Sequence, residues 1–158
     1  MSSARPVVLR GPKRPESVLV VVYTRPGQVL MMRRADHPLF WQSVTGSLEW
    51  DDADLAATAR REVREETGLA PETGWHDWCW SNEYVIFPEW RHRYAPGVMR
   101  NREHVFSLEL AAPEPIVLNP LEHHEYVWVD FAKARTLATS WTNRDAIERI
   151  GRARGFPF

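Results

Sequence analysis

The stretch ADLAATARREVREETG, residues 53–68, is the most informative part of this chain. Its apolar residues recur every three or four positions, which predicts an amphipathic helix over 53–67. Three aspartates can cap the start of this helix: Asp51, Asp52 and Asp54. Gly68 predicts its end, because glycine adopts the left-handed conformation of a helix C-terminal cap without a steric penalty.

Three glutamates near the end of this helix break local rules. They are Glu62, Glu65 and Glu66. Leu55, Ala59 and Val63 trace the stripe that should face the core, and Glu62 and Glu66 border that stripe. Their spacing of four residues places like charges on neighbouring turns, at the helix end where the dipole favours cations. Local rules broken together indicate a functional site.

A divalent cation would relieve this repulsion between carboxylates. Mg²⁺ prefers oxygen ligands, and it often combines one or two carboxylates with water and substrate phosphates. The pattern therefore favours metal-assisted phosphate chemistry. From spacing alone, a solvated Glu/Arg-rich helix face is an equal alternative.

Composition indicates one folded domain over residues 1–158, with 44% hydrophobic and 26% charged residues. The 20 basic and 21 acidic residues give a net charge of -1, which argues against a protein that wraps nucleic acid. No targeting segment or membrane span is expected. The single cysteine, Cys79, excludes an intramolecular disulfide and favours the cytoplasm, and its place in the pattern WHDWCW predicts a buried thiol.

The segments around the helix predict a mixed β-sheet. Strands are expected over 17–24, 28–34, 41–45, 75–87, 100–111 and 124–129. A final helix, capped by Thr142 or Asn143, is expected to run to about residue 153. Strands and helices without regular alternation predict an α+β fold.

Gly46 and the segment REVREETGL at 61–69 resemble the Nudix box, G-x5-E-x7-R-E-U-x-E-E-x-G-U, where U is a bulky apolar residue. The second half of the box matches at every fixed position. Its leading acid falls on Asp52 when counted from Gly46, and on Ala53 when counted back from Arg61. One residue is therefore inserted between the two halves.

This resemblance implies an α/β/α sandwich and Mg²⁺-dependent hydrolysis of a nucleoside diphosphate linked to another group, or of a close analogue. Three further segments resemble the branch of the family that cleaves dihydroneopterin triphosphate to the monophosphate and pyrophosphate in folate biosynthesis: FWQSVTGS at 40–47, RHRYAPGV at 91–98 and SWTNRDAIE at 140–148. Two alternatives stay open. One is a pyrophosphohydrolase of purine nucleoside triphosphates or dinucleoside polyphosphates, and the other is a non-catalytic nucleotide sensor, against which the intact glutamates argue.

The resemblance also implies roles for individual residues. Glu62, Glu66 and Glu122 are implied as metal ligands, with Glu65 or Glu122 as the general base. The implied substrate-binding residues are Lys13, Arg33, Thr45, Tyr84, Val85, Ile86, Phe87 and Ser140. Neighbouring side chains on a strand point to opposite sides, so only one of Arg33 and Arg34 can enter the cleft. Candidate platforms for a flat ring are Tyr84, Phe87, Trp90 and Trp41.

Two other interpretations carry less weight. Adjacent His123 and His124 suggest zinc, but neighbouring histidines tend to point apart and no third ligand has a fitting spacing. The basic-aromatic loop at 91–94 suggests RNA binding, yet a short patch on a near-neutral chain supports this weakly. The expected partner is a small pterin or nucleoside triphosphate, with no nucleic acid, membrane or obligate protein partner.

Overall fold

The central strand of the sheet is β1 (Glu16–Thr24) in the computed structural model, which describes residues 11–158. From Val18 to Tyr23 its even-numbered side chains pack into the core on one face of the sheet, and its odd-numbered ones pack on the other. A strand covered on both faces needs apolar residues at successive positions, not only at alternate ones. The run VLVVVY meets this requirement.

Within residues 11–158 the strands around β1 form the predicted mixed sheet, with seven strands instead of six because the segment expected at 41–45 divides into two. Its parallel neighbour is β6 (Arg100–Leu110), and its antiparallel neighbours are β2 (Gln28–Arg34) and β4 (Val44–Ser47). The outer strands are β3 (Trp41–Gln42) and β7 (His123–Asp130), which pair with β2, and β5 (Trp75–Val85), which pairs with β6.

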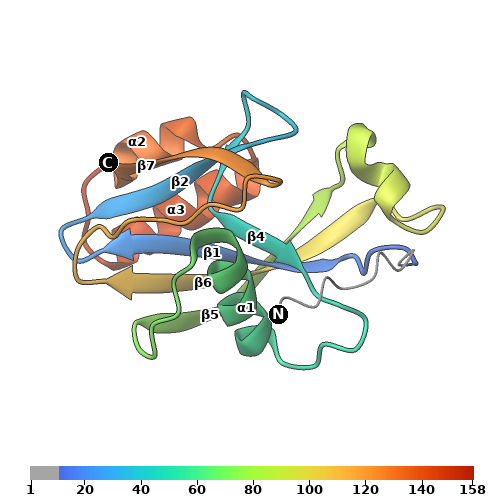
Figure 1. The fold of residues 1–158 in the computed structure, drawn as a ribbon, viewed down its shortest axis with the longest axis horizontal. Helices are drawn as coiled ribbons and strands as arrows, with labels where there is room; N and C mark the ends of the chain where they lie inside the picture. The colour runs from blue at the N-terminus through green and yellow to red at the C-terminus, as the bar shows by residue number, and fades with distance from the viewer. Residues whose placement is uncertain (1–10) are drawn as a thin grey trace.

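Helices cover both faces of this sheet, so the predicted α/β/α sandwich is confirmed (Figure 1). Helix α1 (Leu55–Thr67) packs on one face, and helices α2 (Phe131–Leu137) and α3 (Trp141–Ala153) pack on the other. A short 3-10 helix, η1 (Pro88–Arg93), follows β5. Within residues 11–158, no helix is long and apolar enough to cross a membrane.

Both ends of α1 are fixed by the residues that the sequence suggests. The Asp54 carboxylate accepts hydrogen bonds from the backbone N–H groups of Ala56 and Ala57, at 2.9 and 3.3 Å. Gly68 adopts the left-handed conformation with φ 76°, and its N–H donates to the Arg64 carbonyl at 2.9 Å. The helix begins at Leu55 instead of residue 53, because Asp54 is the cap.

Two details of the second helical layer differ from the sequence prediction. Helix α3 is capped by Ser140, whose Oγ accepts from the Asn143 N–H at 3.2 Å, and not by Thr142 or Asn143. Those two residues are buried in the first turn. Helix α2 was not predicted, because its seven residues are too few to show a helical period and it follows β7 directly.

Cys79 is exposed, so the predicted burial of its thiol is wrong. The pairing of β5 with β6 shifts register between Asp77 and Ser81, and Cys79 lies in this irregular stretch with φ 56°. An irregularity of this kind interrupts the alternation of inward and outward side chains on which the prediction depended.

The cap of α1 generates a stability prediction. We expect Asp54→Ala to lower the free energy of unfolding by about 1 kcal/mol, the usual effect of losing an N-terminal cap. Asp54→Asn is the matched control, since asparagine also caps helices and should retain most of the stability. Urea unfolding measures both variants, and an equal loss in the two would show that capping is not what Asp54 contributes.

Candidate active site

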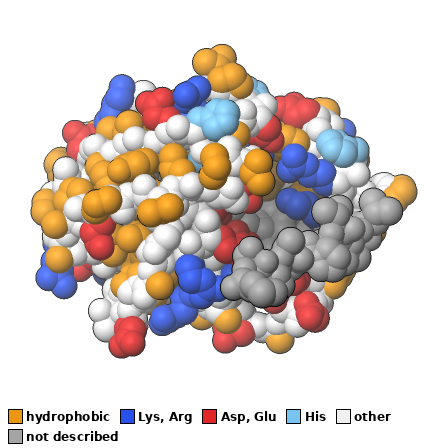
Figure 2. Space-filling view, viewed as in Figure 1, with side chains coloured by type: hydrophobic (Ala, Val, Ile, Leu, Met, Phe, Trp, Pro, Cys, Tyr) orange, Lys and Arg blue, Asp and Glu red, His pale blue; other side chains and the backbone are white. Residues whose placement is uncertain are grey.

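A cleft of about 840 Å³ opens between α1, the start of β7, η1 and the first turn of α3. The chain segment around Lys13, β4 and parts of β1, β5 and β6 complete its walls. Figure 2 shows acidic and basic side chains near the middle of one face. The cleft therefore brings together segments from both ends of the chain.

The close approach of α1 to β4 places the Glu62 side chain against Gly46. A Cβ atom at position 46 would overlap the Glu62 carboxylate, so any larger residue would displace the Glu62 side chain from this position. Burial and the negative charge of Glu65 raise the pKa of Glu62 to about 7. The first fixed glycine of the sequence motif thus makes room for one of its acids.

Glu66 is the most buried acid of the cleft, with 1% of its surface exposed. Neither of its carboxylate oxygens has a hydrogen-bond partner among residues 11–158. Burial, together with the negative charges of Glu62 and Glu122, holds its pKa well above the usual value. A buried carboxylate without a partner is unfavourable unless something cationic or protonated meets it.

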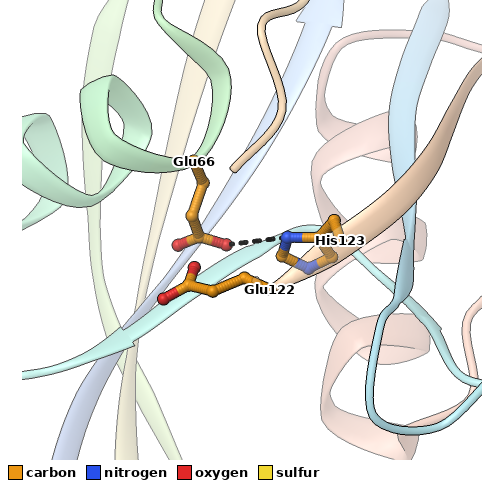
Figure 3. A group of neighbouring side chains, drawn as sticks. All are labelled: Glu66, Glu122 and His123. Carbon is orange, nitrogen blue, oxygen red and sulfur yellow. Dashed lines mark ion pairs between the residues drawn. The ribbon is translucent and has the colours of Figure 1, made fainter. Parts of the chain in front are cut away.

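Glu122 and His123 face Glu66 from the start of β7 (Figure 3). One ligand atom of each of the three residues lies within 4.8 Å of the others. Glu65 lines the same cleft but is exposed and lies 4.0 Å from the Arg61 guanidinium. The four acids named from the sequence therefore share one cleft, where Glu66 and Glu122 lie together with His123 and Glu65 is exposed.

The sequence analysis gave no role to His123 or to its neighbour His124. In the structure His124 is exposed, whereas His123 is buried beside Glu66. Its ring is buried, with Nδ1 3.8 Å from Glu66 Oε1. The Gln42 amide, as oriented, donates to Nε2 at 3.0 Å, which leaves the proton on Nδ1 and directs it at Glu66. Burial lowers the pKa of His123 to about 4, so the ring is neutral and faces Glu66 as a donor.

Despite the inserted residue, hydrogen bonds join the loop that follows Gly46 to the helical half of the motif. The Asp52 carboxylate accepts from Arg61 at 3.0 Å and from the Glu49 N–H at 2.7 Å. Arg14 donates to the backbone carbonyls of Glu49 and Asp52, at 3.1 and 2.7 Å. Asp52 therefore takes the place of the leading acid of the motif, as the count from Gly46 gives. The inserted residue lies between Asp52 and Arg61.

The opposite side of the cleft is basic. Lys13, Arg34 and Arg93 all line it. Burial lowers the pKa of Lys13, and the positive charges of Arg93 and Arg34 lower it further. Asp36 compensates part of this charge by accepting two hydrogen bonds from Arg34, at 2.7 and 2.8 Å. Like charges gathered in a cleft favour the binding of an anion.

The structure places Arg34 in the cleft and Arg33 outside it, contrary to the assignment of Arg33 to the pocket. Arg33 points to the neighbouring strand, where it lies 3.3 Å from Glu125. The pairing of β2 with β7 shifts register between the two arginines. Val85 is likewise outside the cleft and 50% exposed, because Tyr84 and Ile86 on either side of it point inward.

The other predicted pocket residues line the cleft. They are Thr45, Tyr84, Ile86, Phe87 and Ser140. Phe40, Phe87 and Trp90 form an apolar wall of rings in edge-to-face contact, with centroids 5.4 to 5.9 Å apart. Trp41, the other suggested platform, packs in the core beneath α2 and α3 instead.

Asn101 and Glu103 are cleft residues that the sequence analysis did not name. Both lie on the buried side of β6, on the same face as Val105. Burial raises the pKa of Glu103 to about 7. The sequence gives no alternation signal for them, since that side of β6 also carries Ser107 and Glu109 and therefore has the pattern of a solvent-facing side.

Comparison with known proteins assigns the family. Residues 13–150 match the family described as NUDIX domain, so the chain belongs to the Nudix family. It is 46% identical to dihydroneopterin triphosphate diphosphatase of Escherichia coli over 142 residues, which cover 87% of this chain and 93% of that protein. The enzyme of that name from Haemophilus influenzae is 40% identical over 141 residues, 87% of each chain.

A solved structure supports the same relationship. The E. coli dihydroneopterin triphosphate pyrophosphohydrolase superposes with a TM-score of 0.82 and 44% identity, over 89% of this chain and 97% of that one. Nudix hydrolases use a divalent metal ion. The carboxylates here fit one, because they are oxygen donors and both oxygens of the buried Glu66 lack a partner within residues 11–158.

The raised pKa of Glu66 predicts how stability depends on pH without metal. A carboxyl whose pKa is higher in the folded than in the unfolded chain stabilises the fold at low pH, and this contribution is lost as pH rises from about 4.5 through the folded value. Glu66→Gln removes the charge, so the variant should gain stability over the parent protein as pH rises. We expect this gain to be larger at pH 8 than at pH 5 in EDTA.

Urea unfolding at the two pH values measures this difference. Mg²⁺ at pH 8 should stabilise the parent protein more than Glu66→Gln. Comparison of the two proteins cancels the opposite trend of His123, whose lowered pKa makes the fold gain stability as pH rises. The same stability difference at both pH values would contradict the buried-charge assignment.

Proposed function

We propose that this protein hydrolyses dihydroneopterin triphosphate to dihydroneopterin monophosphate and pyrophosphate, as a pyrophosphohydrolase of the Nudix family. The observation that carries the proposal is the 46% identity to dihydroneopterin triphosphate diphosphatase over nearly the full length of both chains. The cleft supports it, because it combines acids that suit a metal ion, basic groups that suit phosphates and an apolar wall that suits a ring.

We assign Mg²⁺ as the ion, held by Glu62, Glu66 and Glu122. Hard oxygen ligands suit Mg²⁺, and a ligand set of carboxylates leaves room for substrate phosphates. When bound, the ion neutralises charge on the triphosphate and lowers the pKa of a bound water. His123 lies beside this ligand set, with its neutral Nδ1–H directed toward Glu66 at 3.8 Å, a distance too long for a hydrogen bond.

The remaining polar groups of the cleft orient the substrate and move a proton. Lys13 and Arg34 bind phosphate oxygens, the first as a point charge and the second as a fork. Glu65 is the exposed helix acid of the cleft and is not one of the three proposed metal ligands, and we assign to it the proton that water releases as it attacks phosphorus. Water supplies the new P–O bond, so no covalent enzyme intermediate is needed.

The ring of the substrate occupies the apolar part of the cleft. Phe40, Phe87 and Trp90 offer ring faces and edges, and Tyr84, Thr45 and Ser140 offer polar groups at its borders. The partner is thus a small molecule, with neither nucleic acid nor another protein required. We place the reaction in the cytoplasm, supported by a cysteine that is exposed and free.

Purine nucleotides are the second class of substrate, since guanine and a pterin share one hydrogen-bonding edge. The test is kcat/KM for dihydroneopterin triphosphate beside dATP, dGTP and a dinucleoside polyphosphate, with Mg²⁺ present and pyrophosphate and phosphate assayed separately. We expect dihydroneopterin triphosphate to be preferred and pyrophosphate to be released. Glu62→Gln and Glu66→Gln should each lower turnover by at least about a hundredfold.

A tenfold advantage for a purine nucleotide, or release of orthophosphate, would replace this proposal with another Nudix activity. Near-normal turnover in both glutamine variants would instead remove the metal assignment.

The position of Arg34 in the cleft predicts different effects on KM for substitutions at Arg34 and at Arg33. We expect Arg34→Ala to raise KM by about tenfold or more, because charge-assisted contacts to phosphate are lost, with Arg34→Lys intermediate since it keeps the charge without the fork. Arg33→Ala should change KM by less than about twofold, as its partner is the surface residue Glu125. A larger effect at Arg33 would show that the side chains exchange places when substrate binds.

A further inference from the structure

The cleft contains a second group of polar residues on the sheet face opposite α1. Ser17 on β1 lies beside Glu103 on β6, and Asn101 precedes Glu103 by two positions on the same side of that strand. All three are buried and line the cleft. They share their face of the sheet with Leu19 and Val105, which pack beneath α2 and α3. The acids on α1 belong to the other face.

Two acceptor atoms in this group are unpaired. Glu103 is 4% exposed, and its Oε1 has no hydrogen-bond partner within residues 11–158. Asn101 donates through Nδ2 to Ser17 Oγ at 2.7 Å, but its Oδ1 is also buried without a partner in that range. Buried acceptors without donors are rare in folded proteins, and at the wall of a cleft they indicate where a ligand supplies N–H groups.

The surroundings of Glu103 limit what can supply these donors. Tyr84 and Ile86 on β5 and the Phe40–Phe87–Trp90 wall border the same cleft, which suits a flat ring better than a flexible chain. Lys13, Arg34 and Arg93 line the cleft too, but Glu103 forms no ion pair with any of them. Oε1 of Glu103 therefore remains available to accept a hydrogen bond from the ring of a substrate. The phosphates of the same substrate would contact the basic groups.

We propose that Glu103 determines specificity by accepting hydrogen bonds from the 2-amino group and the adjacent ring N–H of a 2-amino-4-oxo pyrimidine ring, with Asn101 as a second acceptor nearby. This inference rests on the proposed function, because that ring is part of the proposed substrate. Two adjacent N–H donors match the two oxygens of a carboxylate. Guanine presents the same pair of donors, whereas adenine has no ring N–H on its corresponding edge.

The arrangement explains why the residue is a glutamate despite the unfavourable burial of its charge. A site that hydrogen-bonds specific substrate groups rejects analogues that lack them far more strongly than shape alone does. Thr142, at the start of α3, partly offsets the effect of burial on the pKa of Glu103 through a hydrogen bond. The first turn of α3 thus stabilises the Glu103 carboxylate through Thr142.

A cycle that changes one group on the ligand and one on the protein tests the proposal. GTP and ITP carry the same triphosphate and differ by the 2-amino group, so their inhibition constants against dihydroneopterin triphosphate isolate that group. We expect the parent protein to bind GTP at least about tenfold more tightly than ITP, the scale of a charge-assisted hydrogen bond. Glu103→Gln should abolish this preference while leaving ATP inhibition unchanged within about twofold.

Glu83→Gln is the matched control, because Glu83 is a half-exposed carboxylate on β5 that pairs with Arg102 outside the cleft. It should keep the GTP preference of the parent protein. Near-UV circular dichroism establishes that Glu103→Gln is folded. The comparison of GTP with ITP in the parent protein needs no variant, so equal affinities would overturn the proposal even if the substitution prevents folding.

Equal affinity of the parent protein for GTP and ITP would overturn the role of Glu103, and so would an undiminished preference in folded Glu103→Gln. The proposed function is measured separately, by turnover of dihydroneopterin triphosphate in the parent protein. If that turnover were absent while the GTP preference depended on Glu103, the acceptor role would stand and the substrate assignment would fail. If turnover were efficient without any preference for GTP, the substrate assignment would stand and the acceptor role of Glu103 would fail.

Discussion

The contact between the Glu62 carboxylate and the Cα of Gly46 is the constraint on which the site depends. A Cβ atom at position 46 would overlap this carboxylate, so a larger residue there would displace the Glu62 side chain. One turn further along α1, Glu66 is buried without a hydrogen-bond partner within the described chain. The fold thus accepts a local instability of like charges that a cation can reverse.

The cleft is held open by hydrogen bonds between segments that are far apart in sequence. Ser43, at the break between β3 and β4, donates its N–H to the Asn143 side chain at 2.8 Å and accepts from it through Oγ at 2.9 Å. Lys13 donates its N–H to the Arg93 carbonyl at 2.8 Å, which ties the start of the described chain to η1. The three segments that flank the Nudix box in the sequence therefore meet around one cavity.

Local sequence predicted the fold well, and the four acids that it singled out line one cleft. The even apolar run of β1 and the spacing of acids on α1 are set by neighbouring residues, so periodicity reveals them. Periodicity could not show that Arg34, and not Arg33, lines the cleft. The choice depends on a register shift against β7, about ninety residues away along the chain. Glu103 was missed for a related reason, since burial on one face of a strand is decided by helices that come later in the chain.

The residues that the sequence predicted and those that it missed lie on different faces of the sheet. The acids proposed for chemistry lie mainly on one helix, where four-residue spacing alone sets their geometry, and a short motif can encode them. The polar groups proposed for ring recognition lie on β1, β6 and the first turn of α3, and only the assembled sheet brings them together. Because the two sets are encoded separately, substitutions on the second face can change which ring is accepted without disturbing the acids that hold the metal. The family motif therefore encodes the acids of the site, and the paired strands behind it carry the residues that we propose select the substrate ring.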